Sequence, residues 1–118
     1  MLTGKRRFHL EQFGDVTIAK FVDTRILDEV NIQEIGDHMF GLIDEQGRRK
    51  IILDFSQVEY LSSAVLGKLV TLEKKAKMVH AKLRLCCIRP EIYEAFVLVH
   101  FDKTFDIKST QDEALEGF

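Results

Sequence analysis

Hydrophobic and polar residues alternate at the start of the chain in the pattern of a β-hairpin. Residues 8–13 and 16–22 are rich in the β-branched and aromatic residues that favour strands. Gly14 and Asp15 lie between them, and this pair suits a tight two-residue turn. The pattern therefore predicts two antiparallel strands, followed by a polar connection over residues 23–27.

The period changes to that of a helix from about Asp28 onward, and Gly47 is the expected end of this helix. Its apolar face consists of Ile32, Ile35, Met39, Leu42 and Ile43. A second amphipathic helix is predicted from about Ser63 to His80, because apolar residues again recur at helical spacing between charged ones. This second apolar face consists of Val65, Leu69, Leu72, Ala76 and Val79.

Shorter patterns predict the remaining strands and helices. The continuous apolar run at residues 50–55 is typical of a strand buried on both faces, as in a parallel sheet. Residues 83–88 predict the next strand, and Pro90 suits the first position of a third helix. Residues 105–107 predict a short last strand. The capping-box pattern at residues 110–113 then predicts the start of a final helix.

The order of these elements indicates a single α/β domain over residues 1–118. Strands that alternate with helices imply right-handed crossovers and a mixed, mostly parallel sheet. We expect about five strands and about four helices, with the N-terminal hairpin adding an antiparallel edge. A chain of 118 residues has the usual size of one domain.

Charge and composition exclude several classes of function. The 17 basic and 19 acidic residues are mixed along the chain and leave a formal net charge of −2. This balance gives no general attraction to nucleic acid or to an anionic membrane. Short basic clusters at residues 5–7 and 48–50 are interpreted as a solvated tail and a solvated loop.

The chain has the features of a cytoplasmic protein. No apolar run approaches the roughly 20 residues that span a bilayer, and the first residues do not form a signal peptide. Cys86 and Cys87 are adjacent, and neighbouring strand residues point to opposite faces, so no disulfide is expected between them. Reduced thiols are the simpler interpretation.

The turn that precedes the second helix is the main candidate for function. A buried strand ends at Phe55 and a helix begins near Ser63, and sites in α/β sheets gather beyond the carboxyl ends of strands. A serine there can carry or contact a phosphate that the helix dipole favours. The structural alternative is that Ser62 only caps the helix.

Residues 58–67 resemble the signature of the STAS domain, the fold of bacterial anti-sigma factor antagonists. In that family the signature follows a strand ending in Asp, a hydrophobic residue and Ser, which residues 54–56 match. The segments 101–107 and 113–115 also resemble the usual ending of the family. The similarity covers nearly the whole chain, including the order of its elements.

The resemblance implies a protein–protein switch with no catalytic residue, cofactor or metal of its own. Ser63 takes the place of the serine that a partner kinase phosphorylates in antagonist members, and Ser62 is the runner-up. The implied partner is an anti-sigma factor serine kinase, which the unphosphorylated form binds and so regulates transcription. The implied partner-binding residues are Gln57, Glu59, Tyr60, Ser62, Ser63, Ala64 and Gly67.

Two other functions remain open. The family also includes non-phosphorylated scaffolds and accessory subunits of signalling assemblies or of lipid and anion transporters. Val65 favours that alternative, since it replaces a family glycine and can crowd a docking kinase, although it also extends the apolar face of the helix. Nucleotide hydrolysis would need a glycine and a hydroxyl where Ser62 and Leu69 stand.

Metal, nucleic-acid and membrane roles are not expected from the residue spacing. The four histidines are scattered, and Cys86 and Cys87 with His100 lack the spacing of a zinc site. We expect no binding of nucleic acid and no direct membrane insertion, and a homodimer stays open.

Overall fold

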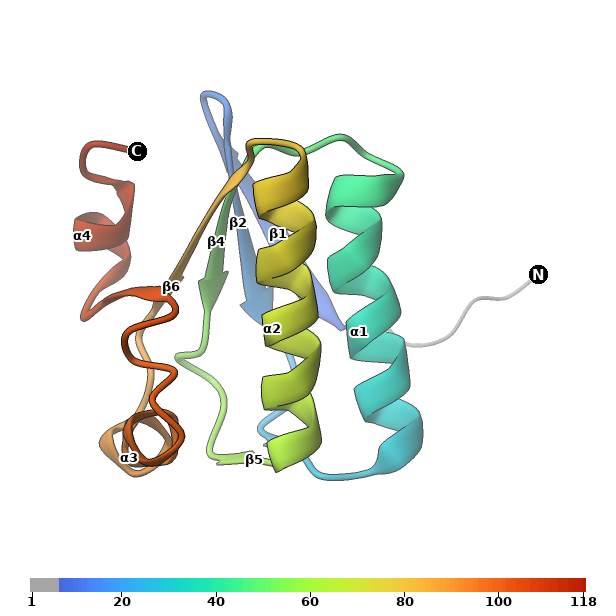
Figure 1. Cartoon of the computed structure of the whole chain (residues 1–118), viewed down its shortest axis with the longest axis vertical. Helices are drawn as coiled ribbons and strands as arrows, with labels where there is room; N and C mark the ends of the chain where they lie inside the picture. The colour runs from blue at the N-terminus through green and yellow to red at the C-terminus, as the bar shows by residue number, and fades with distance from the viewer. Residues whose placement is uncertain (1–6) are drawn as a thin grey trace.

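The computed structural model describes residues 7–118, and five of the strands form a mixed main sheet (Figure 1). The spatial order is β1-β2-β4-β6-β7, in which β1 and β2 are antiparallel and the other neighbours are parallel. The strands are β1 (Phe8–Phe13), β2 (Val16–Phe21), β4 (Lys50–Asp54), β6 (Lys82–Cys86) and β7 (Asp106–Lys108). The predicted fold class, including the N-terminal hairpin, is confirmed.

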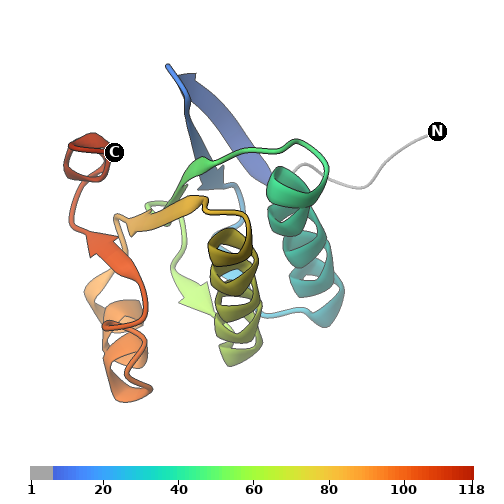
Figure 2. The ribbon, with the colours of Figure 1, turned by 45° about the horizontal axis from the view of Figure 1, so that its top comes forward.

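Helices cover both faces of this sheet. The helices α1 (Glu29–Asp44) and α2 (Ser63–Met78) run side by side on one face, as Figures 1 and 2 both show. The short helix α4 (Gln111–Leu115) packs on the opposite face, and α3 (Pro90–Leu98) follows the carboxyl end of β6. Between residues 7 and 118, no helix is both long and apolar enough to cross a bilayer.

The central strand β4 packs against helices on both faces of the sheet. Ile51 and Leu53 pack with α1 and α2, whereas Ile52 packs with Ala114 of α4 on the other face. All three strand residues have no exposed surface. The prediction of a strand buried on both faces is therefore confirmed.

Local sequence signals account for several boundaries of strands and helices. Gly14 has a φ of 61°, in the left-handed region that the two-residue turn of the hairpin needs. Asp28 caps α1 by accepting a hydrogen bond from the N–H of Val30. Thr110 caps α4 by accepting one from Glu113 at 3.1 Å, as the capping-box pattern predicts.

A second, small sheet was not predicted from the sequence. Two short parallel strands, β3 (Arg25–Ile26) and β5 (Tyr60–Leu61), pair with each other beyond the carboxyl end of the main sheet. The prediction of a mere polar connection at residues 23–27 is therefore wrong in part, since Ile26 is fully buried. A strand of two residues is too short to show a period.

The two cysteines also differ from the expectation. The strand β6 ends at Cys86, because Cys87 adopts a left-handed conformation with a φ of 63°. Their side chains consequently do not point to opposite faces, and the two sulfur atoms lie 3.4 Å apart as free thiols. The predicted strand over residues 83–88 is too long at its end for the same reason.

The basic cluster at residues 5–7 is not simply a solvated tail. Residues 5 and 6 lie outside the described part of the chain, as does the N-terminal stretch that was tested for a signal peptide. Arg7, however, is only 4% exposed, and its guanidinium donates hydrogen bonds to Asp23, Asn31 and Glu34. This network joins the start of β1 to the first turns of α1, so the interpretation as a solvated tail is wrong for Arg7.

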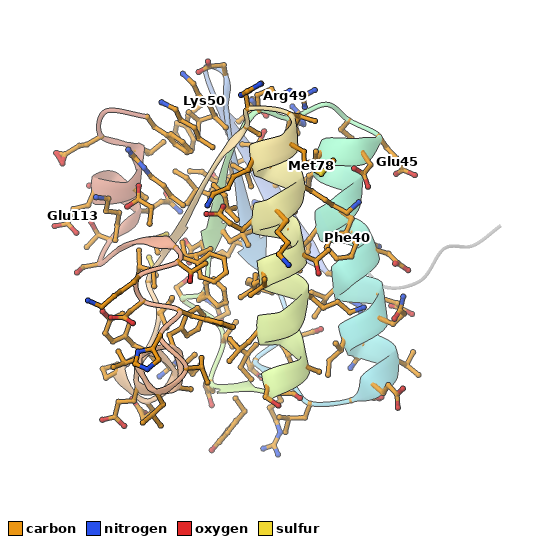
Figure 3. All side chains as sticks on the ribbon, viewed as in Figure 1. Phe40, Glu45, Arg49, Lys50, Met78 and Glu113 are labelled. Atoms are coloured by element: carbon orange, nitrogen blue, oxygen red, sulfur yellow. The ribbon has the colours of Figure 1, made fainter. Side chains whose placement is uncertain are left out.

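Replacement of Arg7 by methionine is expected to destabilise the protein by about 1–3 kcal/mol. The substitution leaves the carboxylates of Asp23 and Glu34 without their buried cation, although their partial exposure reduces the cost. Urea unfolding would measure the loss. The matched control is Arg49→Met, an exposed arginine directly before β4 (Figure 3), which should change stability by less than about 0.5 kcal/mol. Equal effects of the two substitutions would contradict the structural role of Arg7.

Candidate functional site

The candidate site is the turn between β4 and α2, at the carboxyl end of the sheet. Backbone hydrogen bonds to the β3 segment hold this turn in place. The N–H groups of Glu59 and Tyr60 both donate to the carbonyl of Thr24, at 2.8 and 3.1 Å. The N–H of Ser62 donates to the carbonyl of Ile26 at 2.9 Å. The first turn of α2 is therefore positioned by a segment that lies before α1 in the sequence.

Buried side chains fix the other half of the turn. Phe55 and Val58 have no exposed surface and belong to the main core. Asp54 accepts a hydrogen bond from the N–H of Ser56 at 2.8 Å, and Arg89 Nε donates to the carbonyl of Val58 at 3.1 Å. The turn is consequently a packed loop whose polar side chains are held at defined places on the surface.

The two serines have different roles in the geometry of the helix. Ser62 is the N-cap of α2, and its hydroxyl accepts a hydrogen bond from the N–H of Ala64 at 3.2 Å. Ser63 is the first residue of the helix, is exposed, and takes no part in this cap. The capping role that sequence analysis weighed for Ser62 is thus observed, and the hydroxyl of Ser63 is left accessible.

The start of α2 is also suited electrostatically to a negative group. The first turns of α1, α3 and α4 each contain an acidic residue, but the first turn of α2 contains none, among the helices of residues 7–118. The N-terminus of a helix carries a positive partial charge from its free N–H groups. The positive end of the α2 dipole would therefore attract an anion at Ser63, because the first turn of this helix contains no carboxylate that would repel it.

Most of the residues that the sequence analysis named lie on the surface around this turn. Ser62 is half-buried, whereas the others are exposed: Gln57, Glu59, Tyr60, Ser63, Ala64 and Gly67. Ser63 and Gly67 are one helical turn apart and thus lie on the same face of α2. A Cβ atom at Gly67 would have no neighbour within 4 Å, so this face is open.

Val65, which replaces the family glycine, does not belong to that surface. Its side chain is fully buried in the core between α2 and the sheet. The interpretation of Val65 as part of the apolar face of the helix is therefore confirmed. It does not crowd the exposed face that carries Ser63.

A groove of about 350 Å³ adjoins the turn on the side of α3. It is lined by Glu59, Tyr60, Leu61, Leu66, Arg89, Glu91, Ile92 and Ala95. The groove residues after β6 were not predicted from the sequence, although they follow the carboxyl end of a neighbouring parallel strand, where sites gather. Arg89 lies 3.7 Å from the Glu59 carboxylate, and Arg25 stacks over the Tyr60 ring at 4.8 Å, so cations flank both residues.

The two serines can be separated by their effects on stability. Ser62→Ala should lower the free energy of unfolding by about 1 kcal/mol, because it removes the N-cap. Ser63→Ala should change it by less than about 0.5 kcal/mol, since an exposed first-turn hydroxyl makes no comparable contribution. Chemical denaturation of both variants measures the difference. A larger loss for Ser63→Ala than for Ser62→Ala would show that the cap is assigned to the wrong serine.

Comparisons with known proteins agree with this fold. A protein described as an anti-sigma factor antagonist, BtrV of Bordetella bronchiseptica, is 25% identical over 93 residues, which are 79% of each chain. The crystal structure of an anti-sigma factor antagonist from Thermotoga maritima has a TM-score of 0.81 and 25% identity, with 92% of each chain covered. The phosphorylated form of the Bacillus cell fate determinant SpoIIAA shares the fold, with a TM-score of 0.69, 17% identity, and coverage of 92% of this chain and 96% of that one. The family model of the STAS domain matches residues 8–114, and the chain therefore belongs to the STAS domain family.

Proposed function

We propose that this protein is an anti-sigma factor antagonist that acts as a phosphorylation-controlled protein–protein switch. Its unmodified form binds an anti-sigma factor serine kinase in the cytoplasm, and phosphorylation of Ser63 releases that partner. The observation that carries the proposal is the free, exposed hydroxyl of Ser63 at the first position of α2, beside a serine that already supplies the cap. The protein has no catalytic role in this mechanism.

The descriptions of similar proteins support this proposal. BtrV and the Thermotoga protein are both described as anti-sigma factor antagonists, and SpoIIAA is known in a phosphorylated form. These descriptions name the antagonism of another protein and no catalysed reaction. Regulation by binding is accordingly the function that we assign to this chain.

The switch would operate through local charge and desolvation. A phosphoserine carries about −1.5 to −2 charges and three strong acceptor oxygens. At Ser63 the N-terminus of α2 would stabilise these charges within the domain. At a protein interface the same group would have to lose its water close to Glu59, which opposes binding. The domain itself needs no large rearrangement.

The surface around the turn has the chemistry of a protein contact. Tyr60 is 52% exposed and is held by the stacked Arg25, so it presents a rigid aromatic group of the kind that dominates interfaces. Gly67 leaves space on α2 for an approaching backbone or side chain. The burial of Val65 removes the sequence argument for a non-phosphorylated scaffold, because that residue does not reach the contact surface.

Phosphorylation of Ser63 should be visible in the intact mass of the protein. We expect protein isolated from its native cells to include a species heavier by one phosphoryl group, which phosphatase treatment removes. Ser63→Ala should abolish this species, whereas Ser62→Ala should retain it. A Ser63→Ala protein that still carries the phosphoryl group and is still regulated would contradict the assignment.

Gly67→Gln should separate partner binding from folding. Glutamine at this open helical position should raise the free energy of unfolding by about 0.5 kcal/mol, because glycine is a poor helix former. It should also lower the yield of copurified anti-sigma factor kinase about tenfold or more, because it fills the face next to Ser63. Mass spectrometry of the copurified proteins and urea unfolding measure the two effects.

The control for this experiment is Met78→Gln, at the opposite end of α2 (Figure 3). Met78 is 81% exposed, so its replacement changes the surface of the same helix far from the turn. The control should leave copurification unchanged. Equal losses for Gly67→Gln and Met78→Gln would remove the turn as the contact surface.

A further inference from the structure

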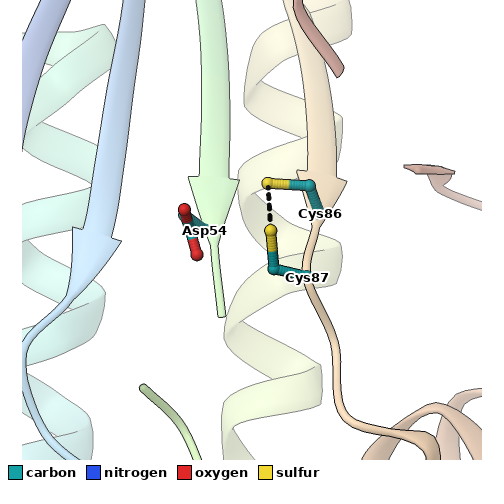
Figure 4. A group of neighbouring side chains, drawn as sticks. All are labelled: Asp54, Cys86 and Cys87. Carbon is teal, nitrogen blue, oxygen red and sulfur yellow. Dashed lines mark hydrogen bonds between the residues drawn. The ribbon is translucent and has the colours of Figure 1, made fainter. Parts of the chain in front are cut away.

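Three potential metal ligands converge at the carboxyl ends of the two central parallel strands. Asp54 is the last residue of β4 and lies opposite Cys86, the last residue of β6. The left-handed conformation of Cys87 turns its sulfur back toward the same point (Figure 4). One carboxylate oxygen and the two sulfur atoms all lie within 4.8 Å of one another.

The distances fit one small cation with tetrahedral coordination. The two sulfur atoms are 3.4 Å apart. In a tetrahedral zinc site with Zn–S bonds of about 2.3 Å, the two sulfurs are about 3.8 Å apart, so a shift of a few tenths of an ångström suffices. Two thiols and a carboxylate are the donor set of a thiophilic divalent ion, whereas Mg²⁺ and Ca²⁺ prefer oxygen donors alone.

Hydrogen bonds from neighbouring groups orient the Asp54 carboxylate, as they orient ligands in known metal sites. Asp54 accepts a hydrogen bond from the N–H of Ser56 on Oδ1 and one from Gln111 Nε2 on Oδ2, both at 2.8 Å. These bonds occupy two of roughly four lone-pair positions and orient the group, so that each oxygen retains one position for a metal.

The cluster is buried but can be reached. Asp54 and Cys86 are buried, while Cys87 is half-buried and so connects the cluster to the surface. A cysteine binds a metal as the thiolate, so a cation has to displace the two thiol protons. Thiophilic ions form strong bonds to sulfur, whereas hard cations prefer oxygen.

We propose that Asp54, Cys86 and Cys87 form a binding site for a thiophilic divalent cation such as Zn²⁺, with the fourth coordination position open to water. One Zn²⁺ replaces the two thiol protons, forms two Zn–S bonds and one Zn–O bond, and releases two protons to solvent. The bound ion connects the ends of β4 and β6, and Gln111 of α4 contacts it only through Asp54. The site lies outside the exposed surface around Ser63, although Asp54 also accepts a hydrogen bond from Ser56 in the turn.

The first test is metal binding by the whole chain, kept reduced and freed of metal with a chelator. Calorimetric titration with Zn²⁺ should show saturation at one ion per chain, with two protons released. Titration with Cd²⁺ should show the ultraviolet charge-transfer absorption of cadmium–thiolate bonds at the same stoichiometry. Mg²⁺ at the same concentrations should give no signal. Absence of saturable Zn²⁺ and Cd²⁺ binding would overturn the proposal.

Variants identify the ligands. Cys87→Ser and Asp54→Asn each remove one ligand and should weaken Zn²⁺ binding about 100-fold or more, whereas Gln111→Ala removes an orienting partner and should weaken it about 10-fold. Glu113→Gln, an exposed carboxylate on the same helix α4, is the matched control and should bind as the parent does. Circular dichroism shows whether each variant folds. If Asp54→Asn unfolds, Cys87→Ser and Gln111→Ala still test the proposal, because both replaced residues are only half-buried. Unchanged Zn²⁺ affinity in folded Cys87→Ser would assign any binding to another site.

Discussion

The start of α2 depends on the backbone pairing between β3 and β5. The turn after β4 contains N–H groups that no helix or main-sheet strand satisfies, and the carbonyls of Thr24 and Ile26 accept three of them. Backbone N–H groups need hydrogen-bond partners, so this pairing restricts where the turn can lie. The buried side chains of Phe55 and Val58 then prevent the turn from swinging away from the core. The position of Ser63 follows from these two constraints together.

The carboxyl end of the main sheet carries two proposed sites, one exposed and one buried. On the α1–α2 side, the turn presents exposed polar groups over a fully packed core. On the α4 side, Asp54 and Cys86 are buried, and Asp54 accepts a hydrogen bond from Gln111. Both arrangements derive from parallel strands that end side by side, since such strands bring residues that are distant in sequence to one edge. Asp54 belongs to both, because its Oδ1 fixes Ser56 in the turn and its Oδ2 faces α4.

The long elements could be predicted from sequence because each repeats its pattern over several residues. The apolar faces of α1 and α2 show such repeats, and β4 shows a continuous apolar run. The resemblance of residues 58–67 to the family signature predicted where the turn lies. The features that were missed depend on contacts between distant residues. Arg7 can be buried because it donates hydrogen bonds to Asp23, Asn31 and Glu34. These partners are distant in sequence, so no local pattern predicts the contacts. The left-handed conformation of Cys87 is likewise invisible in a residue type that rarely adopts it.

The placement of Val65 separates what this helix needs for folding from what its surface offers for binding. Residues 65, 66 and 69 face the core, whereas residues 63, 64 and 67 face solvent. A change from glycine to valine at position 65 therefore alters core packing and helix propensity without changing the exposed face. Differences in partner recognition must then arise from exposed groups, which at the adjoining groove include Glu59, Tyr60 and Arg89. Specificity and phosphorylation can consequently reside on neighbouring but separate parts of one surface.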